Sequence, residues 1–289
     1  MDYIDLNGKR IKGENGQEKL LKQLYGTEAG RMALKVLTMR CVSEVAGKLL
    51  DSRFSSFLID GFAKRNHIDR REYEQRKYCS FNDFFTRKIR TGKRPVACTG
   101  SAGGGLVSPS DGKVTVYPVT QDLEVKVKGR TYTLESLLKN QTVASHFRGG
   151  YVYIVRLCVE DYHRYIYPVS GMKTKNYHIN GVYHTVNPIA GEYYPIYKEN
   201  TREYTLIRAE NKGYVLQMEV GALLVGRIVN HHQSRKVRCG EEKGYFEYGG
   251  STIVVITDQN MAPPRQELLR NTAEGCETKI LQGQLLTEK

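Results

Sequence analysis

The stretch Glu247-Tyr248-Gly249-Gly250-Ser251-Thr252-Ile253-Val254-Val255-Ile256 contains the clearest strand signal of this chain and its most unusual serine. The β-branched apolar residues of its second half predict a β-strand over residues 251–256. The two glycines leave no side chain beside the serine hydroxyl, and they tolerate φ angles that other residues avoid. A serine in this position can attack the carbonyl group of its own backbone.

Short β-branched and aromatic runs, separated by glycine or proline, recur throughout the sequence that precedes this stretch. They predict strands at Lys113–Val119, Leu123–Val127, Tyr151–Leu157, Tyr214–Val220 and Leu223–Val229. From about residue 17 to 66, apolar residues instead recur at helical spacing. The sequence therefore predicts an α+β fold, with a helical N-terminal region (1–78) followed by a β-rich domain with largely antiparallel sheets (79–289).

Composition limits the classes of partner. The chain has 289 residues, 40% of them hydrophobic, and a formal charge of +13, so it can bury a large core and should meet an anionic partner. That partner could be nucleic acid, a membrane surface or an acidic small molecule, but no recognition-helix or RNA-binding motif supports nucleic acid. The six cysteines are dispersed without a Cys-x-x-Cys pair, which predicts no metal site and a reduced, cytosolic environment.

The membrane is a plausible anionic partner on sequence grounds. No apolar run reaches the length of a spanning helix, so we expect contact from one side only, at the cytoplasmic face. The N-terminal helical region offers a basic surface for lipid headgroups: Lys19, Lys22, Arg31, Lys35, Arg40, Lys48, Arg53, Lys64 and Arg65. The alternative is a helical subdomain that simply packs on its neighbour.

Two further side chains could act with Ser251. Asp111 follows Ser108-Pro109-Ser110 and precedes a glycine, a pattern typical of a turn-forming aspartate. His163 lies in Glu160-Asp161-Tyr162-His163-Arg164, directly after a predicted buried strand, where a purely structural histidine is an equal alternative. Together Asp111, His163 and Ser251 supply an acid, a base and a nucleophile, a set that recurs on unrelated folds.

Several short motifs follow one another in a fixed order along the chain. They are Phe84-Phe85-Thr86-Arg87 with Arg94-Pro95, Pro109-Ser110-Asp111-Gly112, Asp161-Tyr162-His163-Arg164, Val186-Asn187, Asn200-Thr201-Arg202, Val220-Gly221-Ala222 with Val225-Gly226, and Lys243-Gly244-Tyr245-Phe246 with Gly249-Gly250-Ser251-Thr252. Each motif is weak alone, whereas the ordered set is specific and resembles the phosphatidylserine decarboxylase family. Without this context, the segment around Asn200 would be interpreted as a surface turn.

The resemblance implies a proenzyme that cleaves itself between Gly250 and Ser251. The products would be a β chain (1–250) and an α chain (251–289), and Ser251 would become a pyruvoyl group. That group would serve as the cofactor, forming a Schiff base with phosphatidylserine in an anionic membrane and yielding phosphatidylethanolamine. The resemblance makes Asp111 the residue that orients the histidine and His163 the candidate proton donor. Self-association into a homo-oligomer is left open.

One position departs from the family pattern, which reads Asp-Tyr-His-Arg-x-His, because Ile166 occupies the place of the second histidine. Either His163 also activates Ser251, or His184 or, less favourably, His146 takes that role. Three other functions compete with the resemblance. They are a pyruvoyl-dependent decarboxylase of a free amino acid, a serine hydrolase using Asp111, His163 and Ser251, and a basic module without enzymatic activity.

Overall fold

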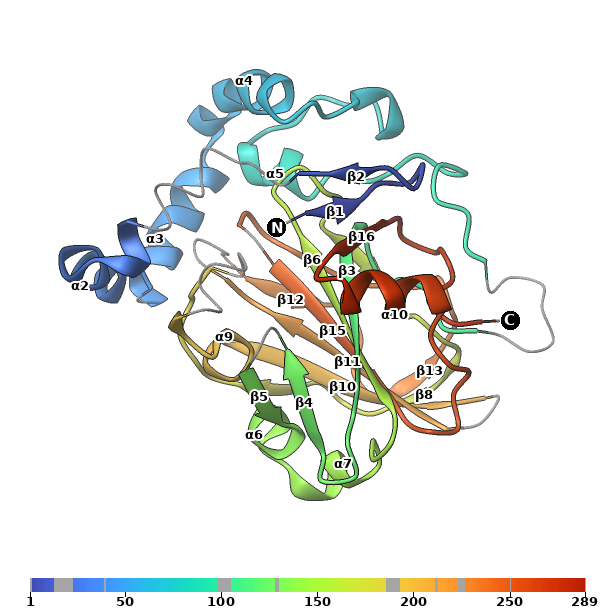
Figure 1. The fold of residues 1–289 in the computed structure, drawn as a ribbon. Coiled ribbons are helices and arrows are strands. Elements are labelled where there is room, and N and C mark those ends of the chain that lie inside the picture. The colour runs from blue at the N-terminus through green and yellow to red at the C-terminus, as the bar shows by residue number, and fades with distance from the viewer. Residues whose placement is uncertain are drawn as a thin grey trace.

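The computed structural model describes residues 2–12, 23–38, 40–97, 105–127, 130–185, 193–210, 213–222, 227–249 and 251–288. A large, mostly antiparallel sheet forms its centre (Figure 1). Its strand order is β13-β8-β10-β11-β15-β6-β3-β16-β1-β2, and β9 pairs with β10. This arrangement confirms the predicted α+β class with largely antiparallel sheets.

The strands of the large sheet come from distant parts of the chain. They are β1 Tyr3–Ile4, β2 Arg10–Ile11, β3 Gly112–Pro118, β6 Tyr151–Leu157, β8 Gly171–Lys173, β9 Tyr177–Ile179, β10 Arg202–Ala209, β11 Tyr214–Val220, β13 Arg235–Val237, β15 Ser251–Thr257 and β16 Glu277–Ile280. A smaller sheet has the order β12-β14-β7, with bounds Ile228–Asn230, Glu242–Phe246 and Arg164–Ile166. Strands β4 (Glu124–Val127) and β5 (Arg130–Thr133) form a hairpin.

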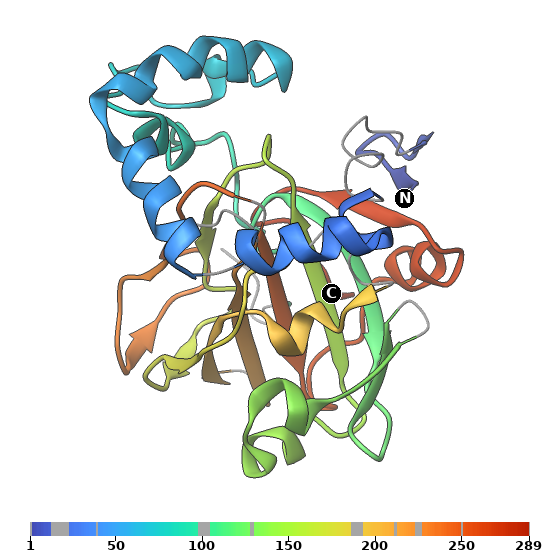
Figure 2. The same ribbon diagram turned by 90° about the vertical axis from the view of Figure 1, so that its left-hand side faces the viewer.

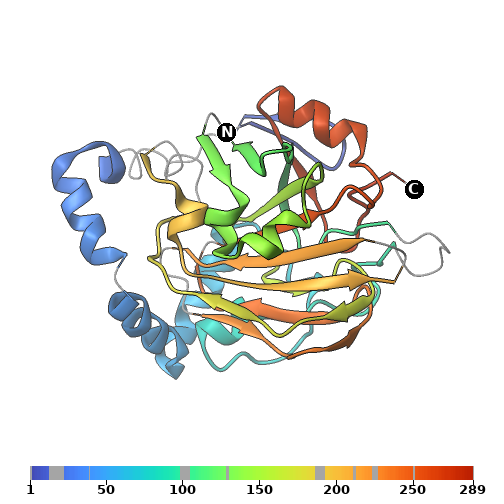
Figure 3. The ribbon, with the colours of Figure 1, turned by 90° about the horizontal axis from the view of Figure 1, so that it is seen from below.

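Most helices lie in the N-terminal region or cover the sheet. They are α2 Glu28–Leu37, α3 Arg40–Asp51, η1 Arg53–Phe57, α4 Leu58–Arg65, η2 Arg70–Glu72, α5 Phe81–Phe85, α6 Leu134–Leu138, α7 Gln141–Ser145, α9 Ile196–Glu199 and α10 Gln266–Ala273. Helices α2, α3 and α4 follow one side of the body (Figures 2 and 3). Within the described ranges, no helix has the length and apolar character needed to cross a bilayer.

Both faces of the large sheet are buried, which explains the unbroken apolar runs in β6 and β15. Val155 and Ile253 face a core that includes Leu268 of α10 and Phe246 of β14. Their neighbours in sequence point to the opposite face, where the β4–β5 hairpin, α6 and α7 close a second core. Residues 251–257 are therefore buried without exception.

The strand predictions agree with β3, β4, β6, β11 and β15, whereas residues 223–226 of the predicted run Leu223–Val229 lie outside the described residues. Two features were not anticipated. Strands β1 and β2 belong to the N-terminal region, yet β1 pairs with β16 near the C-terminus. The other is Cys239, which is disulfide-bonded, contrary to the predicted reduced environment; Cys79, Cys158 and Cys276 are free. The division of the chain at residue 78 stays a prediction.

Candidate active site

The residues singled out from sequence gather along one edge of the large sheet. Because its central strands are antiparallel, β3 and β15 begin where β6 ends. Ser251 pairs with Leu157, and Asp111 directly precedes β3 at the same edge. The chain then leaves β6 and runs through residues 158–163 to His163. This edge therefore brings together motifs that are separated by up to 140 residues.

Ser251 is completely buried, and its hydroxyl has no hydrogen-bond partner among the residues that the structure describes. Alternation along β15 points this side chain to the face of Ile253 and Val255. Gly249 has a φ of 137°, a region that favours glycine, whereas Gly250 lies outside the described residues. The hydroxyl of Thr252 also lacks a described partner, but it points to the opposite face.

His163 lies next to the segment that leads to Ser251. Its backbone carbonyl accepts a hydrogen bond from the Phe246 N–H (3.0 Å), and the Gly249 backbone lies close enough to its ring to raise the pKa of the imidazole in part. The ring Nδ1 donates to the Asp161 carbonyl (2.9 Å), so in the neutral ring Nε2 carries the lone pair. Nε2 is buried, and no contact between it and a described residue, Gly249 included, has the geometry of a hydrogen bond. Burial lowers the pKa of His163 from 6.5 to about 4, which keeps the ring neutral near pH 7.

Asp111 is buried, but groups other than His163 bind its carboxylate. Arg94 donates to both of its oxygens, through Nε (2.9 Å) and Nη2 (2.7 Å), and the Gln282 N–H donates to Oδ1 (2.8 Å). Among the hydrogen bonds between described residues, none joins Asp111 to His163 or Ser251. Gly112 must be glycine, because a Cβ there would lie 2.7 Å from the carbonyl oxygen of Arg156.

Ile166, which replaces the second histidine of the family pattern, lies beside the Asp111 turn. Its N–H donates to the Pro109 carbonyl (2.9 Å), and its side chain is buried. An isoleucine at this position cannot accept a proton. Residue 166 therefore supplies no proton acceptor, and proton transfer at this edge has to come from another group.

The two alternative histidines occupy different ends of the sheet. His184 stacks on Tyr194 (ring centroids 4.4 Å apart), and its backbone is bound on both sides by the buried Asn200. Asn200 also donates to the Gly221 carbonyl, so His184 lies at the same edge as Ser251. His146 packs on Tyr214 at the start of β11, about 20 Å of strand from that edge. This separation excludes His146.

The Asn200-Thr201-Arg202 segment is the site feature that local sequence patterns missed, because all three residues are buried rather than part of a surface turn. Arg202 donates to the carbonyl groups of Leu137, Lys198 and Asn200. Burial lowers its pKa to about 10. Only the ordered motif set indicated this segment, while Val186-Asn187 and Val225-Gly226 of that set lie outside the described residues.

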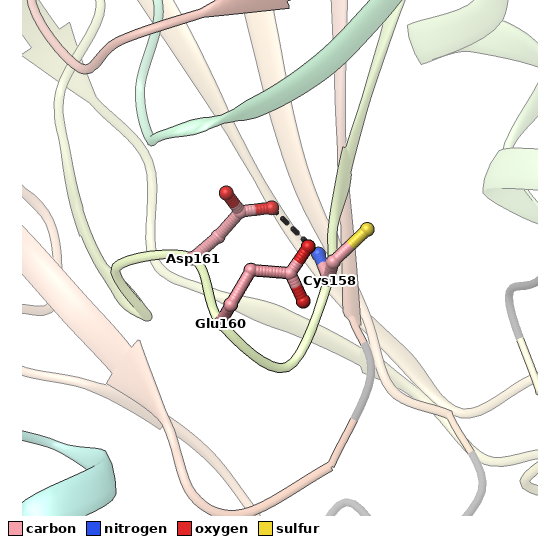
Figure 4. Close-up of side chains that lie close together, drawn as sticks. All are labelled: Cys158, Glu160 and Asp161. Atoms are coloured by element: carbon pink, nitrogen blue, oxygen red, sulfur yellow. Dashed lines mark hydrogen bonds between the residues drawn. The ribbon is translucent and has the colours of Figure 1, made fainter. Parts of the chain in front are cut away.

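Cys158, Glu160 and Asp161 come close enough to suggest a metal site (Figure 4). However, the Asp161 carboxylate binds the Cys158 N–H (2.8 Å) and forms an ion pair with Lys279. The thiol lies 3.1 Å from Nη1 of Arg156 and 3.3 Å from Nζ of Lys113. The side chains of Lys113, Arg156 and Lys279 therefore already surround this cluster, although Arg156 is also paired with Glu277, and we assign no metal ion to it.

The fold and this edge define an α+β protein with a buried serine, a neutral histidine and glycine-dependent backbone at one end of a central sheet. The family model for phosphatidylserine decarboxylase matches residues 81–286. A phosphatidylserine decarboxylase proenzyme 2 of Clostridium acetobutylicum is 42% identical over 95% of this chain and 92% of its own length. Proenzymes of Ruminiclostridium cellulolyticum and Clostridium botulinum are 37% and 34% identical over 93% and 97% of this chain, and over 90% and 96% of their own lengths. The chain belongs to the phosphatidylserine decarboxylase family.

Proposed function

We propose that this protein is a proenzyme that cleaves itself between Gly250 and Ser251 and then decarboxylates phosphatidylserine to phosphatidylethanolamine. The observation that carries the proposal is the buried, unpartnered hydroxyl of Ser251 at the start of β15. A buried hydroxyl without a partner costs about 1–3 kcal/mol. Thr252 and Thr257 share this state, and Ser251 differs from them because it directly follows Gly249-Gly250 at the start of β15. Nucleophilic attack on the preceding peptide bond gives this hydroxyl a chemical role.

His163 is our candidate base for this attack. Its unpartnered Nε2 would take the hydroxyl proton while Ser251 Oγ bonds to the carbonyl carbon of Gly250. The peptide C–N bond then breaks, the nitrogen of residue 251 regains a proton, and an ester joins the two halves. Loss of the Cα proton of residue 251 expels the Gly250 carboxylate. Addition of water to the resulting dehydroalanine releases ammonia and leaves a pyruvoyl group at the start of the α chain.

The site fits such a group, because residue 251 is enclosed by apolar strand residues and has no described polar side chain that binds its hydroxyl. The pyruvoyl carbonyl supplies the electron sink that amino-acid decarboxylation requires. His163 would then protonate the carbon that loses CO₂. The register of β15 between β6 and β11 would keep the new α chain in place after cleavage.

The proposal includes peripheral binding to the anionic cytoplasmic face of the cell membrane. Six exposed large apolar side chains lie between residues 32 and 58: Met32, Val45, Leu49, Phe54, Phe57 and Leu58. The exposed side chains of Lys35, Lys48 and Arg53 accompany them. An apolar surface with interspersed cations is suited to the headgroup region of an anionic bilayer.

Intact-mass measurement of the purified protein tests the cleavage. We expect the wild type and Thr252→Ala to yield fragments 1–250 and 251–289, with the second carrying a pyruvoyl group, and Ser251→Ala to stay whole. A single wild-type chain with an unmodified serine would refute the mechanism and favour a serine hydrolase. Release of CO₂ from phosphatidylserine vesicles, compared with release from free amino acids, decides the substrate.

A further inference from the structure

The short helix α5 contacts both groups that the self-cleavage step must bring together. Figure 1 shows it next to the strand ends at the top of the sheet. Its C-terminal side meets the loop of His163, and its N-terminal side meets the segment before Ser251. Neither contact involves the reacting atoms. The inference drawn from them rests on the proposed self-cleavage.

Arg87, just after α5, holds the loop that orients His163. Its guanidinium group is fully buried and donates to the carbonyl groups of Glu160 (3.2 Å) and Asp161 (3.4 Å). The Asp161 carbonyl is the same atom that accepts the Nδ1 proton of His163. Phe85 covers the imidazole with ring centroids 4.2 Å apart. Arg87 and Phe85 thereby fix the ring orientation that leaves Nε2 free.

Asn82, in the first turn of α5, holds the segment that leads to the scissile bond. Its Oδ1 accepts a hydrogen bond from the Tyr248 N–H (2.9 Å), and its Nδ2 donates to Asp51 Oδ1 (2.9 Å). Both partners fix the amide orientation, because an N–H only donates and a carboxylate only accepts. The Tyr248 ring packs edge-on against Phe81 and Phe85. The backbone three residues before Ser251 is thus tied to α5.

We propose that Asn82 and Arg87 are positioning residues for self-cleavage, and that α5 sets the placement of the His163 ring relative to the Tyr248–Gly249 backbone that leads to the scissile bond. A single rigid helical turn serves this purpose better than two independent loops, since the two contacts cannot drift apart. Proximity effects are steep, and a displacement of about 1 Å can cost on the order of 100-fold in rate.

Variants of Arg87 test one half of the proposal. We expect Arg87→Met to slow fragment formation by on the order of 100-fold. Arg87→Lys keeps the charge but loses the forked guanidinium group, so its cleavage rate should lie between those of wild type and Arg87→Met. Two charged groups change the pKa of the His163 ring: Arg87, after α5, lowers it, and Asp161, in the loop of His163 itself, raises it. Removing the guanidinium charge should therefore also move the acid limb of the cleavage rate to higher pH, whereas Arg87→Lys should leave it unchanged.

An exchange of partners tests the other half. Asn82→Asp alone sets two carboxylates against each other and should slow cleavage at least tenfold. Combining Asn82→Asp with Asp51→Asn restores a donor and an acceptor in reversed roles and keeps an acceptor for Tyr248, so the rate should return to within about threefold of wild type. Asp83→Asn is the matched control, because this α5 side chain contacts Arg76 and the Cys79 N–H instead.

Folding and chemistry are separated by two further measurements. Each variant is melted in the Ser251→Ala background. In chains that keep Ser251, mild hydroxylamine, which cleaves an ester much faster than an amide, measures how much ester has formed through the fragments that it releases at residue 250. The proposal expects less ester at native-like melting temperatures. Wild-type cleavage rates in Arg87→Met and Asn82→Asp overturn it, as does a folded exchange variant that stays slow. A wild type that never splits overturns the proposed function instead.

Discussion

Arg94 binds Asp111 through both carboxylate oxygens, and the two side chains are only 7% and 5% exposed. The resemblance implied that Asp111 orients a histidine, but in this structure the carboxylate is occupied by Arg94 and the Gln282 N–H. Loss of activity in an Asp111 variant would therefore have two candidate causes. Stability must be measured before a catalytic role is assigned.

We predict that Asp111→Ala, in the Ser251→Ala background, lowers the free energy of unfolding by about 3 kcal/mol, because it leaves the buried Arg94 charge with only the partly exposed Glu72 (3.2 Å) as its ion partner. Urea denaturation measures this change. Asp60→Ala is the control, since Asp60 pairs with Arg70 but is 88% exposed, and such pairs contribute about 0–1 kcal/mol. Equal effects of the two substitutions would contradict the prediction.

The depressed pKa of His163 predicts an unusual pH dependence of cleavage. With a base of pKa about 4, fragment formation should stay constant from pH 7 to below the ordinary histidine value of 6.5, and should decline only towards pH 4. Single-turnover cleavage of freshly refolded proenzyme provides the measurement. An acid limb near 6.5 would point to a less buried base.

Stability should depend on the same histidine. The unfolded chain takes up a proton at His163 as the pH falls below 6.5, whereas the folded protein resists it until about pH 4, so stability declines across that window. His163→Gln, again in the Ser251→Ala background, should remove this part of the decline. An unchanged pH profile would show that the ring is not buried neutral in solution.

Sequence patterns predicted the elements whose signal is local. The apolar runs of β6 and β15 and the alternating run of β3 need no partner to be recognised, and they agree with the structure. Strands of two residues carry no such signal. Strand β1 is visible only through its parallel pairing with β16, a contact between opposite ends of the chain.

Sequence patterns pointed to residues that lie at one sheet edge, but they did not predict the contacts of these residues. Ser251, His163 and Asp111 do come to one sheet edge, as strand order requires, but the partner of each is set by tertiary contacts. Arg94 and Asp111 are 17 residues apart and Asn82 and Tyr248 are 166 apart, and no spacing rule links either pair. Their side chains also have ordinary alternative roles in turns and caps.

The exposed aromatic residues of η1 predict how the protein binds membranes. Phe54 and Phe57 are 87% and 78% exposed, and full burial of one phenylalanine contributes about 1.5–3 kcal/mol. Phe54→Ser and Phe57→Ser should each weaken binding to anionic vesicles by on the order of tenfold, as measured by sedimentation. Met172→Ser, an exposed apolar residue on β8 in the large sheet, is the control and should bind like wild type. Equal binding of all three variants would remove this surface from the proposal.

Lys243 and Glu219 form an ion pair that is completely buried between β14 and β11 (Nζ–Oε2 2.5 Å), and Asn230 bonds to both side chains. Burial lowers the pKa of Lys243 and raises that of Glu219, so desolvation opposes the charged form of each partner. We predict that Lys243→Met alone costs about 3–5 kcal/mol of stability, because it leaves a carboxylate uncompensated in the core.

The double variant Lys243→Met with Glu219→Leu removes both charges and should be about as stable as wild type or more so. Urea denaturation of both single variants and the double variant, in the Ser251→Ala background, completes the cycle. A double variant that is clearly less stable than wild type would show that the pair is a net source of stability, contrary to this prediction.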